Sequence, residues 1–579
     1  MSLDEYLAIM HGDGRGATTG VKTKNTAVFA DALCAAHHNR HRILVVLSGS
    51  HAWCKKIAAA WYDDAKQRVW IGDASHAADS LSVAKAKQVL GSEYRLAVLD
   101  AHLGLSPDCI AAVSGAVAAG GVLVLLTPAW QHWGTAPDAD YARLTSYPHA
   151  VSGLSSYFLL HLKKSLDAFS GNDNVFFHWQ EGCVNDAELS LPPPFFMCDA
   201  ETKDSTPTAA QQNCLEQLLS HTGVAVLLAD RGCGKSATLG FVAAAWQKIG
   251  KSVLLVAPSR AAASSVFHYR GENLLFSAPD NVLSSKNLQA DILLIDEAAA
   301  IPLSMLLRLL ERFPRVVLST TIDGYEGTGQ GFVVRFLHEL NRQFPSWQHL
   351  TLDEPIRWAV DDPLSHWLYK TLLLDAKEAQ LEEEDAVNAN CMVVESISQQ
   401  RLAQDETLLR EVYGLLRSAH YRTTPDDLRF LLDAPSVSLY RLVQRSHTLA
   451  VALLVEEGSI DAAMAEEIAA GRRRPRGHLL VQSLAVHLQQ SQFLQQRVSR
   501  VVRIAVHTQF QAQGLGSHFL QEILQAQKKQ GICAVGSSFS AAPDVLRFWQ
   551  KNGFDLLRIG HRRQAASAEP SALVLKVFD

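Results

Sequence analysis

The segment from Val224 to Trp246 constrains the fold more than any other part of the sequence. A run of the buried-strand type, Val224 to Leu228, leads directly into a glycine-rich loop, and a helical pattern follows from Ala237 to Trp246. The loop reads Ala229-Asp230-Arg231-Gly232-Cys233-Gly234-Lys235-Ser236. Strand, glycine-rich loop and helix in this order are typical of a P-loop, in which backbone N–H groups and the positive end of the helix hold phosphate. The sequence therefore predicts an α/β domain that binds ATP or GTP.

The positions of this loop have predicted roles. We expect Lys235 to reach the β- and γ-phosphates and Ser236 to hold Mg²⁺. The neighbouring residues of the site are Gly232, Cys233, Gly234 and Ala237. Ala229 stands where P-loops carry their first glycine, and alanine fits there only if its φ angle is negative. The alternative interpretation is a chance Gly-Lys-Ser in a turn.

A second element further along the chain favours the P-loop interpretation. The residues Asp291-Ile292-Leu293-Leu294-Ile295-Asp296-Glu297-Ala298 form a hydrophobic strand that ends in two acids. In the Walker-B arrangement, Asp296 contributes to the Mg²⁺ shell and Glu297 orients the water that attacks the γ-phosphate. An acidic pair after a strand is weak evidence alone, but together with the P-loop it predicts nucleotide hydrolysis.

Two further features resemble helicase-like NTPases. Gln211 lies upstream of the P-loop strand, where such enzymes often place a glutamine that reads adenine, and Gln212 is an equal candidate on spacing alone. Leu318-Ser319-Thr320-Thr321 resembles the strand-end motif that couples nucleotide state to nucleic acid in those enzymes. A plain buried strand is the competing interpretation.

A second glycine loop lies near the C-terminus. The strand pattern Val501-Val502-Arg503-Ile504-Ala505-Val506 precedes Gln511-Ala512-Gln513-Gly514-Leu515-Gly516-Ser517, which opens a helical stretch from His518 to Gln527. This Q-x-x-G-x-G pattern resembles the pyrophosphate motif of the GNAT acetyltransferases, and the later stretch Val545 to Phe554 resembles their late helix and its Gly-Phe ending. The resemblance implies that acetyl-CoA is held by Ile504, Ala505 and Val506 on a splayed strand and by the loop Gln511 to Ser517. The alternative is an ordinary strand-turn-helix crossover.

The remaining organisation is multidomain α/β. The chain of 579 residues is long enough for three or four domains, and strand runs near 43–47, 96–100 and 122–126 predict a parallel sheet in the first third. Linker-like segments at 191–194 and 382–385 divide the chain. We predict an N-terminal α/β domain over 1–198, a RecA-like P-loop ATPase domain over 199–380, and a GNAT acetyltransferase domain over 386–579.

Composition excludes several classes. The longest apolar stretch, Ala116 to Leu126, is too short to span a membrane, and the acidic N-terminus is unlike a signal peptide. Nine cysteines without a CxxC pair fit a reduced, cytoplasmic protein. The histidines between His37 and His41 are interpreted as a solvated segment, with no ligand role. The net charge of −6 limits nucleic-acid contact to local surfaces.

The motifs that connect these domains resemble one family. They are Leu90-Gly91-Ser92-Glu93, Gly324-Tyr325-Glu326-Gly327-Thr328-Gly329-Gln330-Gly331-Phe332, Pro355-Ile356-Arg357-Trp358-Ala359, His420-Tyr421-Arg422-Thr423-Thr424-Pro425-Asp426-Asp427-Leu428 and Leu432-Asp433-Ala434-Pro435. Over essentially its whole length the chain resembles the bacterial tRNA(Met) cytidine acetyltransferases. The resemblance implies ATP-dependent acetylation of the exocyclic amine of the wobble cytidine in elongator tRNA(Met), with acetyl-CoA as donor.

The same resemblance implies further site residues. Arg357 joins Gln211 and the loop Gly232 to Ser236 in holding the nucleotide, and Asp544 and Lys551 hold acetyl-CoA as replacements for an expected Glu and Arg. Arg335 is either a phosphate sensor or an exposed helical residue. His507 is either the base that accepts the amine proton or a structural histidine beside the cofactor.

The predicted partner is tRNA, bound by a monomer. Positive charge near the acetyltransferase site comes from three groups: Arg472-Arg473-Arg474-Pro475-Arg476; Arg497, Arg500 and Arg503; Arg558, Arg562 and Arg563. They suit a phosphate-backbone path, although each alone could be a solvated surface. Family members usually continue into a helical tail that helps to hold tRNA, so we expect reduced or rearranged tRNA affinity. The competing functions are an ATP-coupled protein lysine acetyltransferase and an RNA-remodelling ATPase with a non-catalytic GNAT domain.

Overall fold

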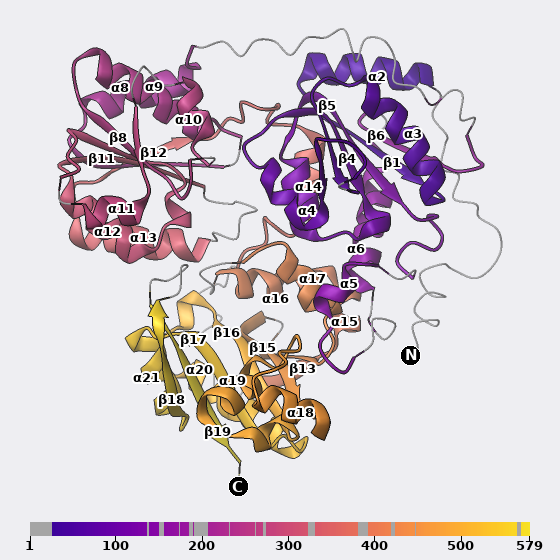
Figure 1. The fold of residues 1–579 in the computed structure, drawn as a ribbon, viewed down its shortest axis with the longest axis vertical. Coiled ribbons are helices and arrows are strands. Elements are labelled where there is room, and N and C mark those ends of the chain that lie inside the picture. The colour runs from indigo at the N-terminus through magenta and orange to yellow at the C-terminus, as the bar shows by residue number, and fades with distance from the viewer. Residues whose placement is uncertain are drawn as a thin grey trace.

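The computed structural model describes most of the chain from residue 26 to residue 578. The residues it leaves out within that span are 74, 136–137, 150–153, 155, 173, 185–188, 190–205, 231, 261, 270–273, 286, 322–329, 380–391, 419–422, 446 and 564–568. Both expected linkers, 191–194 and 382–385, and parts of the motifs at 324–332 and 420–428 lie outside the described residues. The described strands form three sheets, one in each of three lobes (Figure 1).

The first sheet is six-stranded and parallel, in the order β3-β2-β4-β5-β1-β6. Its strands are β1 (Ile43–Ser48), β2 (Arg68–Gly72), β3 (Ser80–Ser82), β4 (Tyr94–Asp100), β5 (Val117–Thr127) and β6 (Phe176–Gln180). The helices of this region are α2 (Thr26–Asn39), α3 (His51–Asp64), α4 (Pro107–Ser114), α5 (Tyr141–Leu144) and α6 (Tyr157–Phe169). Short 3₁₀ turns are η1 (Val83–Val89) and η2 (Ala101–Leu103).

The second sheet is also six-stranded and parallel, in the order β12-β7-β11-β10-β8-β9. Its strands are β7 (Gly223–Ala229), β8 (Val253–Val256), β9 (Leu275–Ser277), β10 (Ile292–Ile295), β11 (Arg315–Thr321) and β12 (Gln348–Leu352). Its helical segments are α8 (Ala209–Ser220), α9 (Lys235–Lys248), α10 (Ser264–Tyr269), α11 (Pro279–Ser284), η5 (Ala298–Ala300), α12 (Leu303–Arg312) and α13 (Gln330–Gln343). Figure 1 shows α8 and α9 on one side of this sheet and α12 and α13 on the other.

The third sheet is seven-stranded and mixed, in the order β13-β14-β15-β16-β17-β19-β18, and only the β16–β17 pair is parallel. Its strands are β13 (Met392–Ile397), β14 (Val437–Gln444), β15 (His447–Gly458), β16 (Arg497–Val506), β17 (Ala534–Ser540), β18 (Asp555–Arg563) and β19 (Pro570–Val577). The helical segments are α15 (Gln399–Gln404), α16 (Glu406–Ser418), α17 (Asp426–Asp433), α18 (Ala462–Ala469), α19 (Leu479–Leu488), η8 (Ser491–Leu494), η9 (Thr508–Phe510), α20 (Leu515–Lys529) and α21 (Pro543–Lys551).

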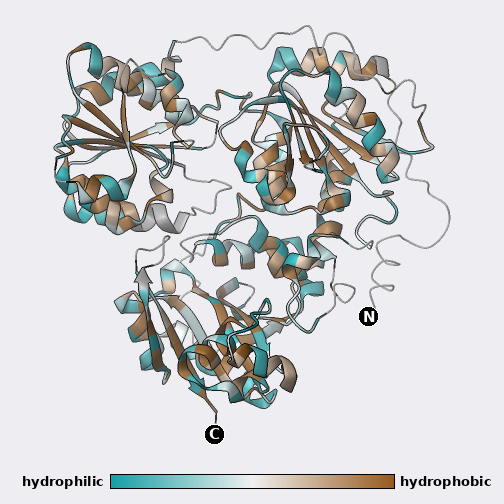
Figure 2. Ribbon diagram, viewed as in Figure 1, coloured by the Kyte–Doolittle hydropathy of each residue, from teal (hydrophilic) through white to brown (hydrophobic). Residues whose placement is uncertain are grey.

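These elements follow from the sequence pattern. The parallel strands are continuous apolar runs because helices cover both faces of such sheets, and Figure 2 shows the hydrophobic residues concentrated in the sheets. Capping side chains fix where helices begin: Ser50 Oγ accepts the N–H of Trp53 at the start of α3, and Thr208 forms a capping box with Gln211 at the start of α8. The predicted multidomain α/β class, including the parallel sheet of the first third, is therefore confirmed.

The first and third lobes share one hydrophobic core. Helix α14 (Pro363–Thr371) follows the second sheet in sequence but lies beside α4 of the first lobe (Figure 1). Its Leu364 and Leu368 belong to the same buried cluster as Leu44 of β1, Leu416 of α16 and Leu431 of α17. Helices α16 and α17 of the third lobe are therefore packed against the N-terminal lobe as well as against their own sheet.

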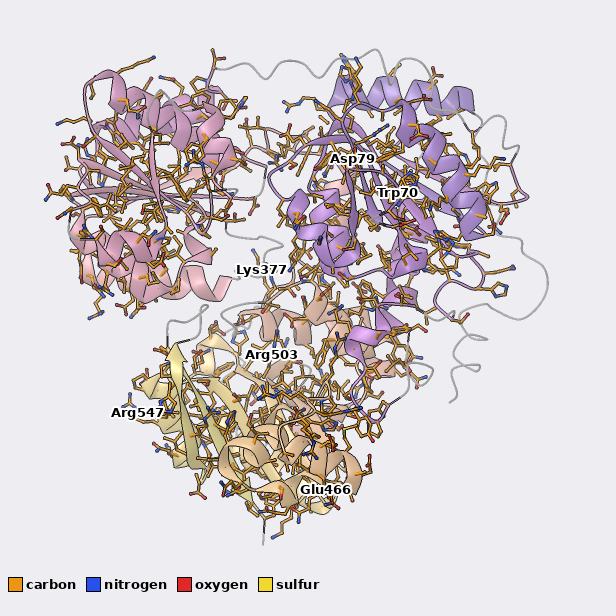
Figure 3. The ribbon with its side chains drawn as sticks, in the orientation of Figure 1. Trp70, Asp79, Lys377, Glu466, Arg503 and Arg547 are labelled. Atoms are coloured by element: carbon orange, nitrogen blue, oxygen red, sulfur yellow. The ribbon has the colours of Figure 1, made fainter. Side chains whose placement is uncertain are left out.

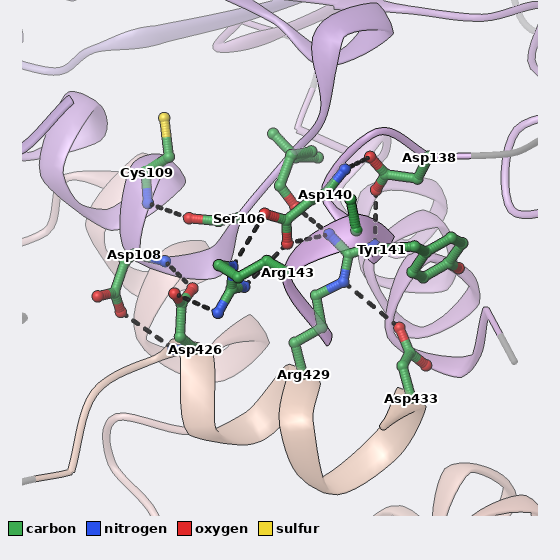
Figure 4. Close-up of polar contacts among 12 residues, drawn as sticks. Ser106, Asp108, Cys109, Asp138, Asp140, Tyr141, Arg143, Asp426, Arg429 and Asp433 are labelled. Atoms are coloured by element: carbon green, nitrogen blue, oxygen red, sulfur yellow. Dashed lines mark hydrogen bonds and ion pairs between the residues drawn. The ribbon is translucent and has the colours of Figure 1, made fainter. Parts of the chain in front are cut away.

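A buried ion network pins this contact (Figure 4). The guanidinium of Arg429 on α17 is fully buried and lies 2.6 Å from Asp138 and 3.0 Å from Asp140, which both belong to the first lobe. Asp433, one turn later on α17, accepts the backbone N–H of Phe158 at 3.0 Å. Removing one partner of such a buried pair would leave an uncompensated charge, so these contacts specify how the two lobes dock. No helix among the described residues is long and apolar enough to cross a membrane.

Candidate functional site

The P-loop has the geometry that phosphate binding requires. Gly232 and Gly234 adopt positive φ angles of 87° and 81°, a region that favours glycine, and α9 begins directly at Lys235. Ala229 is the last residue of β7 and is not among the residues with positive φ. The substitution of the usual first glycine is therefore tolerated, because the strand backbone needs no glycine there.

The loop is covered by the segment Pro355 to Trp358. The N–H of Ile356 donates to the Gly232 carbonyl at 2.7 Å. A Cβ atom on Gly234 would come within 2.2 Å of the Ile356 side chain and 2.7 Å of Gln211 Nε2. Gly234 is thus required both by its conformation and by the close approach of these two side chains.

Lys235 lies over the loop as a P-loop lysine should. Its side chain is buried, and Nζ donates to the carbonyl oxygens of Ala229 at 3.2 Å and Asp230 at 3.0 Å. These bonds keep the ammonium group at the mouth of the loop, where it can exchange them for hydrogen bonds to phosphate oxygens. The neighbouring Cys233 is buried, and burial raises the pKa of its thiol to about 11, so it stays protonated.

Asp296 lies at the centre of the second polar cluster. Its Oδ1 accepts hydrogen bonds from Ser236 Oγ at 3.2 Å and Ser319 Oγ at 2.6 Å, which joins the P-loop, β10 and β11. Its Oδ2 is buried and has no hydrogen-bond partner among the described residues. A serine hydroxyl beside an unsatisfied carboxylate oxygen is the donor set that Mg²⁺ prefers, so these residues fit a magnesium site. Glu297 follows, half-buried, with a φ of 50°.

The environment of Asp296 predicts a pH dependence. Burial, and then the charge of Glu297, raise the pKa of Asp296 to about 6. A protonated carboxyl does not attract a cation, so the Mg²⁺-dependent part of nucleotide affinity should be present at pH 7 and lost as the pH falls to 5. Titrations of nucleotide with Mg²⁺ or with EDTA across this range measure it. Asp296→Asn should show a small Mg²⁺ effect that does not change with pH; the wild-type dependence in that variant would contradict the assignment.

The two glutamines that could contact adenine have different surroundings in the structure. Gln211 is buried and donates from Nε2 to the Gly234 carbonyl at 3.2 Å, whereas Gln212 is exposed and bonds to Glu216. Only Gln211 therefore contacts the P-loop. Ser319 of the strand-end motif is tied directly to Asp296, so this strand is more than a plain buried one. The side chain of Arg335 lies outside the described residues.

Arg357 contacts the N-terminal lobe in this structure. Its Nε lies 3.2 Å from Glu93 Oε1 and its Nη1 donates to the Gly115 carbonyl at 3.2 Å, both in the N-terminal lobe. Arg357 joins the P-loop cover to the first sheet in this conformation.

The third sheet opens where acetyl-CoA is expected. The parallel pairing of β16 with β17 ends at Val501 and Ser537, although β16 continues to Val506 and β17 to Ser540. The backbone groups of Ile504 to Val506 on that side are consequently free of sheet bonds. Gln511 Nε2 donates to the Val506 carbonyl at 3.0 Å, which ties the glycine loop to the end of the strand.

The start of α20 forms the second half of this site. Gly514 caps the helix with a φ of 89°, and a Cβ atom on Gly516 would lie 3.3 Å from Val506 Cγ2 and 3.4 Å from Phe548 Cε2. Ser517 Oγ accepts a hydrogen bond from Asn552, which follows α21, at 3.1 Å. Ala512 has a φ of 60°, which adds to the turn between strand and helix. Loop, strand end and late helix therefore meet, as the sequence pattern indicates.

The two further acetyl-CoA candidates, Asp544 and Lys551, lie on α21, and the candidate base His507 directly follows β16. Asp544 is exposed and pairs with Arg547 on the same helix, and Lys551 is exposed at the end of α21. Both ring nitrogens of His507 face backbone groups: Nε2 lies 2.8 Å from the Ala379 carbonyl and Nδ1 accepts the N–H of Gln509 at 3.4 Å. This geometry favours the structural role for His507 over the role of proton acceptor.

Sequence reasoning missed a polar cluster in the first lobe. Ligand atoms of His51, Asp100 and His102 lie within 4.8 Å of one another, and His51 Nε2 is 2.7 Å from Asp100 Oδ2. The side chains follow the carboxyl ends of β1 and β4, which are separated by β5 in the sheet. Only the predicted strand ends could have signalled the cluster.

Comparisons with known proteins match every lobe. The N-terminal region of tRNA(Met) cytidine acetyltransferase TmcA matches residues 23–176, the helicase domain of RNA cytidine acetyltransferase NAT10/TcmA matches residues 226–375, and GNAT acetyltransferase 2 matches residues 411–533. The crystal structure of the ribosomal-protein-S18-alanine N-acetyltransferase from Escherichia coli is 13% identical and covers 32% of this chain and 93% of its own, with a TM-score of 0.22.

Relatives match across the lobes as well. The tRNA(Met) cytidine acetyltransferase TmcA of Nitrosococcus halophilus is 35% identical over 582 residues, which are 95% of this chain and 77% of that protein. The same enzyme of Photorhabdus asymbiotica is 36% identical over 543 residues, 92% of this chain and 76% of that protein. With this similarity spanning all three sheets, the chain belongs to the family of the tRNA(Met) cytidine acetyltransferases TmcA.

Proposed function

We propose that the protein acetylates the exocyclic amine of the wobble cytidine in elongator tRNA(Met), using acetyl-CoA and ATP. The observation that carries this function is that two helices in one chain each begin directly after a glycine loop, which is the arrangement suited to phosphate. The first, at α9, adjoins the Asp296 cluster, and the second, at α20, adjoins a strand that separates from its neighbour. The curated relatives that combine these parts are named for tRNA(Met) cytidine acetylation.

The acetyltransferase lobe supports direct transfer. The amine attacks the thioester carbon, a C–N bond forms, and the C–S bond breaks with the proton ending on the CoA sulfur. Backbone N–H groups of β16 beyond Val501 are positioned to bind the pantetheine arm and the oxyanion. No protein nucleophile is required, because alignment of the two reactants removes much of the entropic cost.

ATP hydrolysis in the second lobe would drive the displacement of the wobble base that the reaction requires. The wobble base is stacked in the anticodon loop, and splaying it out costs a few kcal/mol. Lys235 and the loop amides would hold the phosphates, Glu297 would orient water, and Ser236 and Asp296 would hold Mg²⁺, which would neutralise the phosphate charge. Ser319 bonds to Asp296 and belongs to the strand-end motif, so it connects the nucleotide site to the rest of the lobe.

Three of the arginines expected to contact tRNA pair with carboxylates of the protein. Arg500 and Arg503 are not free cations: Arg500 lies 2.5 Å from Glu457, and Arg503 lies 2.6 Å from Asp427, with both guanidinium groups largely buried. Exposed Arg497 pairs with Glu456. The side chains of Arg562 and Arg563 lie outside the described residues.

The loop 472–476 keeps more exposed charge. Arg472 pairs with Glu467, and Arg476 donates to the Ala142 carbonyl of the N-terminal lobe at 2.8 Å, whereas Arg473 and Arg474 are exposed. The loop therefore lies beside the first lobe, with two arginines directed to solvent. We propose that these arginines contact tRNA phosphates.

Changing Arg473 and Arg474 to alanine should weaken tRNA binding. Each lost phosphate contact should reduce the slope of log affinity against log salt by somewhat less than one, because fewer counterions are released. Filter binding of tRNA at several salt concentrations measures both quantities. Lys528→Ala with Lys529→Ala removes two exposed charges at the other end of α20 and should change neither as strongly. Equal effects of the two double variants would mean that the loop is only a solvated surface.

One assay separates the candidate functions. The purified chain is incubated with radiolabelled acetyl-CoA and ATP, with total RNA or total protein as acceptor. Label in tRNA at the wobble cytidine supports the proposal, label in protein supports a lysine acetyltransferase, and ATP hydrolysis without transfer supports an RNA-remodelling ATPase. We further propose that the enzyme works in the cytoplasm and that it is a monomer. Sedimentation of the purified chain tests the oligomeric state.

A further inference from the structure

A cavity of about 230 Å³ lies between the helices α16 and α17 and the strands β15 and β16. Its volume is below the range of about 300–1,000 Å³ of sites for drug-sized ligands, which suits one small ring. The walls are mostly apolar and include the aromatic rings of Tyr413 and Phe430 and the side chains of Leu453 and Val502. The charged residues on the wall are Asp427 and Arg503.

The cavity adjoins the place where the third sheet opens. Val502 and Arg503 directly follow Val501, the last residue of β16 that pairs with β17. The pairing of β16 with β15 skips Val502, because Leu453 opposes Arg503 and Leu454 opposes Val501. Such a bulge re-aims side chains, and here two consecutive residues line the same cavity. Figure 3 shows Arg503 on the side of the third lobe that faces the other two.

The two faces of β16 have different neighbours. Ile504 and Val506 pack with the residues of α20, where the pyrophosphate is expected, whereas Val502 and Ala505 pack with α16. A donor that enters along α20 and passes between β16 and β17 therefore presents its acetyl group near the side of the sheet that carries the cavity.

Asp427 and Arg503 form a fixed pair of acceptor and donor groups. Arg503 Nη2 lies 2.6 Å from Asp427 Oδ1, and Asp427 Oδ2 accepts the Thr424 N–H at 2.8 Å. Tyr413 donates to the Thr424 carbonyl at 3.2 Å, which holds the same turn in place. Burial raises the pKa of Tyr413, so its ring remains neutral. The ion pair uses few of the five N–H groups of the guanidinium, and the others can donate to a ligand.

We propose that this cavity receives the base that is acetylated, and that Asp427 and Arg503 select cytosine over uracil; the inference rests on the function proposed above. A carboxylate beside a guanidinium presents an acceptor next to donors, as the Watson–Crick edge of guanine does. Cytosine offers an amine donor that complements the Asp427 carboxylate, and N3 and O2 acceptors that complement the Arg503 guanidinium. Uracil would instead place its O4 acceptor against the carboxylate and its N3–H donor against the guanidinium. Tyr413 and Phe430 supply apolar and aromatic surface for the ring.

The first test compares conservative variants of the pair. Arg503→Lys keeps the charge but loses the planar fork, and Asp427→Asn keeps the shape but loses the charge. Each should reduce kcat/KM for tRNA acetylation about 10- to 100-fold, as expected for one lost base contact. Acetyl-CoA affinity by calorimetry and ATP hydrolysis should stay near wild type, and circular dichroism checks that the variants remain folded. The control Arg500→Lys alters an ion pair on the same strand that does not line the cavity and should leave kcat/KM unchanged.

The second test is a readout that a structural role would not move. A tRNA transcript with uridine in place of the acceptor cytidine should inhibit the wild-type enzyme weakly. It should inhibit Asp427→Asn several-fold more strongly, because the new amide can donate to O4. Unchanged kcat/KM in both variants, unchanged inhibition by the uridine transcript, or loss of acetyl-CoA affinity in the variants would each overturn the assignment. Wild-type enzyme that transfers no acetyl group to tRNA would instead overturn the proposed function, and the inference with it.

Discussion

Lys235→Ala should abolish ATP hydrolysis while acetyl-CoA binding stays near wild type. The substitution removes the ammonium group that Ala229 and Asp230 hold at the mouth of the P-loop. Loss of one electrostatic group of this kind costs about 100-fold or more in rate. The acetyl-CoA site lies on a different sheet with its own core, so its affinity should be unaffected. Phosphate release and calorimetry measure the two quantities.

The matched control is Lys248→Ala, an exposed lysine at the other end of α9. It removes the same charge from the same helix and should leave hydrolysis intact. A folded Lys235→Ala protein that also fails to bind acetyl-CoA would contradict the assignment of two separate phosphate sites. Acetylation of tRNA by this variant should fall as well, if ATP hydrolysis drives the splaying of the base.

Gly516→Glu should abolish acetyl transfer and leave ATP hydrolysis near wild type. A Cβ atom at this position already lies 3.3 Å from Val506, so a longer side chain must extend into the space in front of the first turn of α20. Its negative charge would then face the pyrophosphate of the donor at the positive end of the helix. Radiolabelled transfer and calorimetry with acetyl-CoA measure the effect.

Two further variants grade this result. Gly516→Ala adds only the tight Cβ contact and should weaken acetyl-CoA binding less than the charged side chain does. Gln525→Glu adds the same charge on an exposed position further along α20 and should have little effect. An active Gly516→Glu enzyme would remove the donor site from this helix.

Local patterns were sufficient to predict several strands and the two loop–helix junctions of the fold. The apolar runs near 224–228 and 501–506 became β7 and β16, and the glycine loops lie between strand and helix as expected. They succeed because strand burial, positive φ at glycine and helix starts are determined within a few residues. The docking of α14 against the first sheet was not predictable, because it depends on apolar contacts between residues more than two hundred positions apart.

The candidate sites show the same division. Gln211 and Gln212 are equivalent in spacing, and only the turn of α8 decides which one is buried against Gly234. Arg500 and Arg503 read as available positive charge, but carboxylates of Glu457 and Asp427 neutralise them. Ion pairing between distant segments leaves no periodic signal in a sequence. The cavity beside β16 was missed for the same reason, since a bulge at Val502 creates part of its wall.

Because the first and third lobes share a core, the chain is not a row of three independent domains. Leu364 and Leu368 of α14 return to the N-terminal lobe after the second sheet, and Leu416 and Leu431 extend the same core towards the acetyltransferase strands. In topological terms the ATPase lobe is an inserted domain, because the chain on either side of it contributes to one shared core. Residues on both sides of the link between α14 and α16 belong to this one core, so a cleavage in that link would leave the core held together by side-chain packing alone.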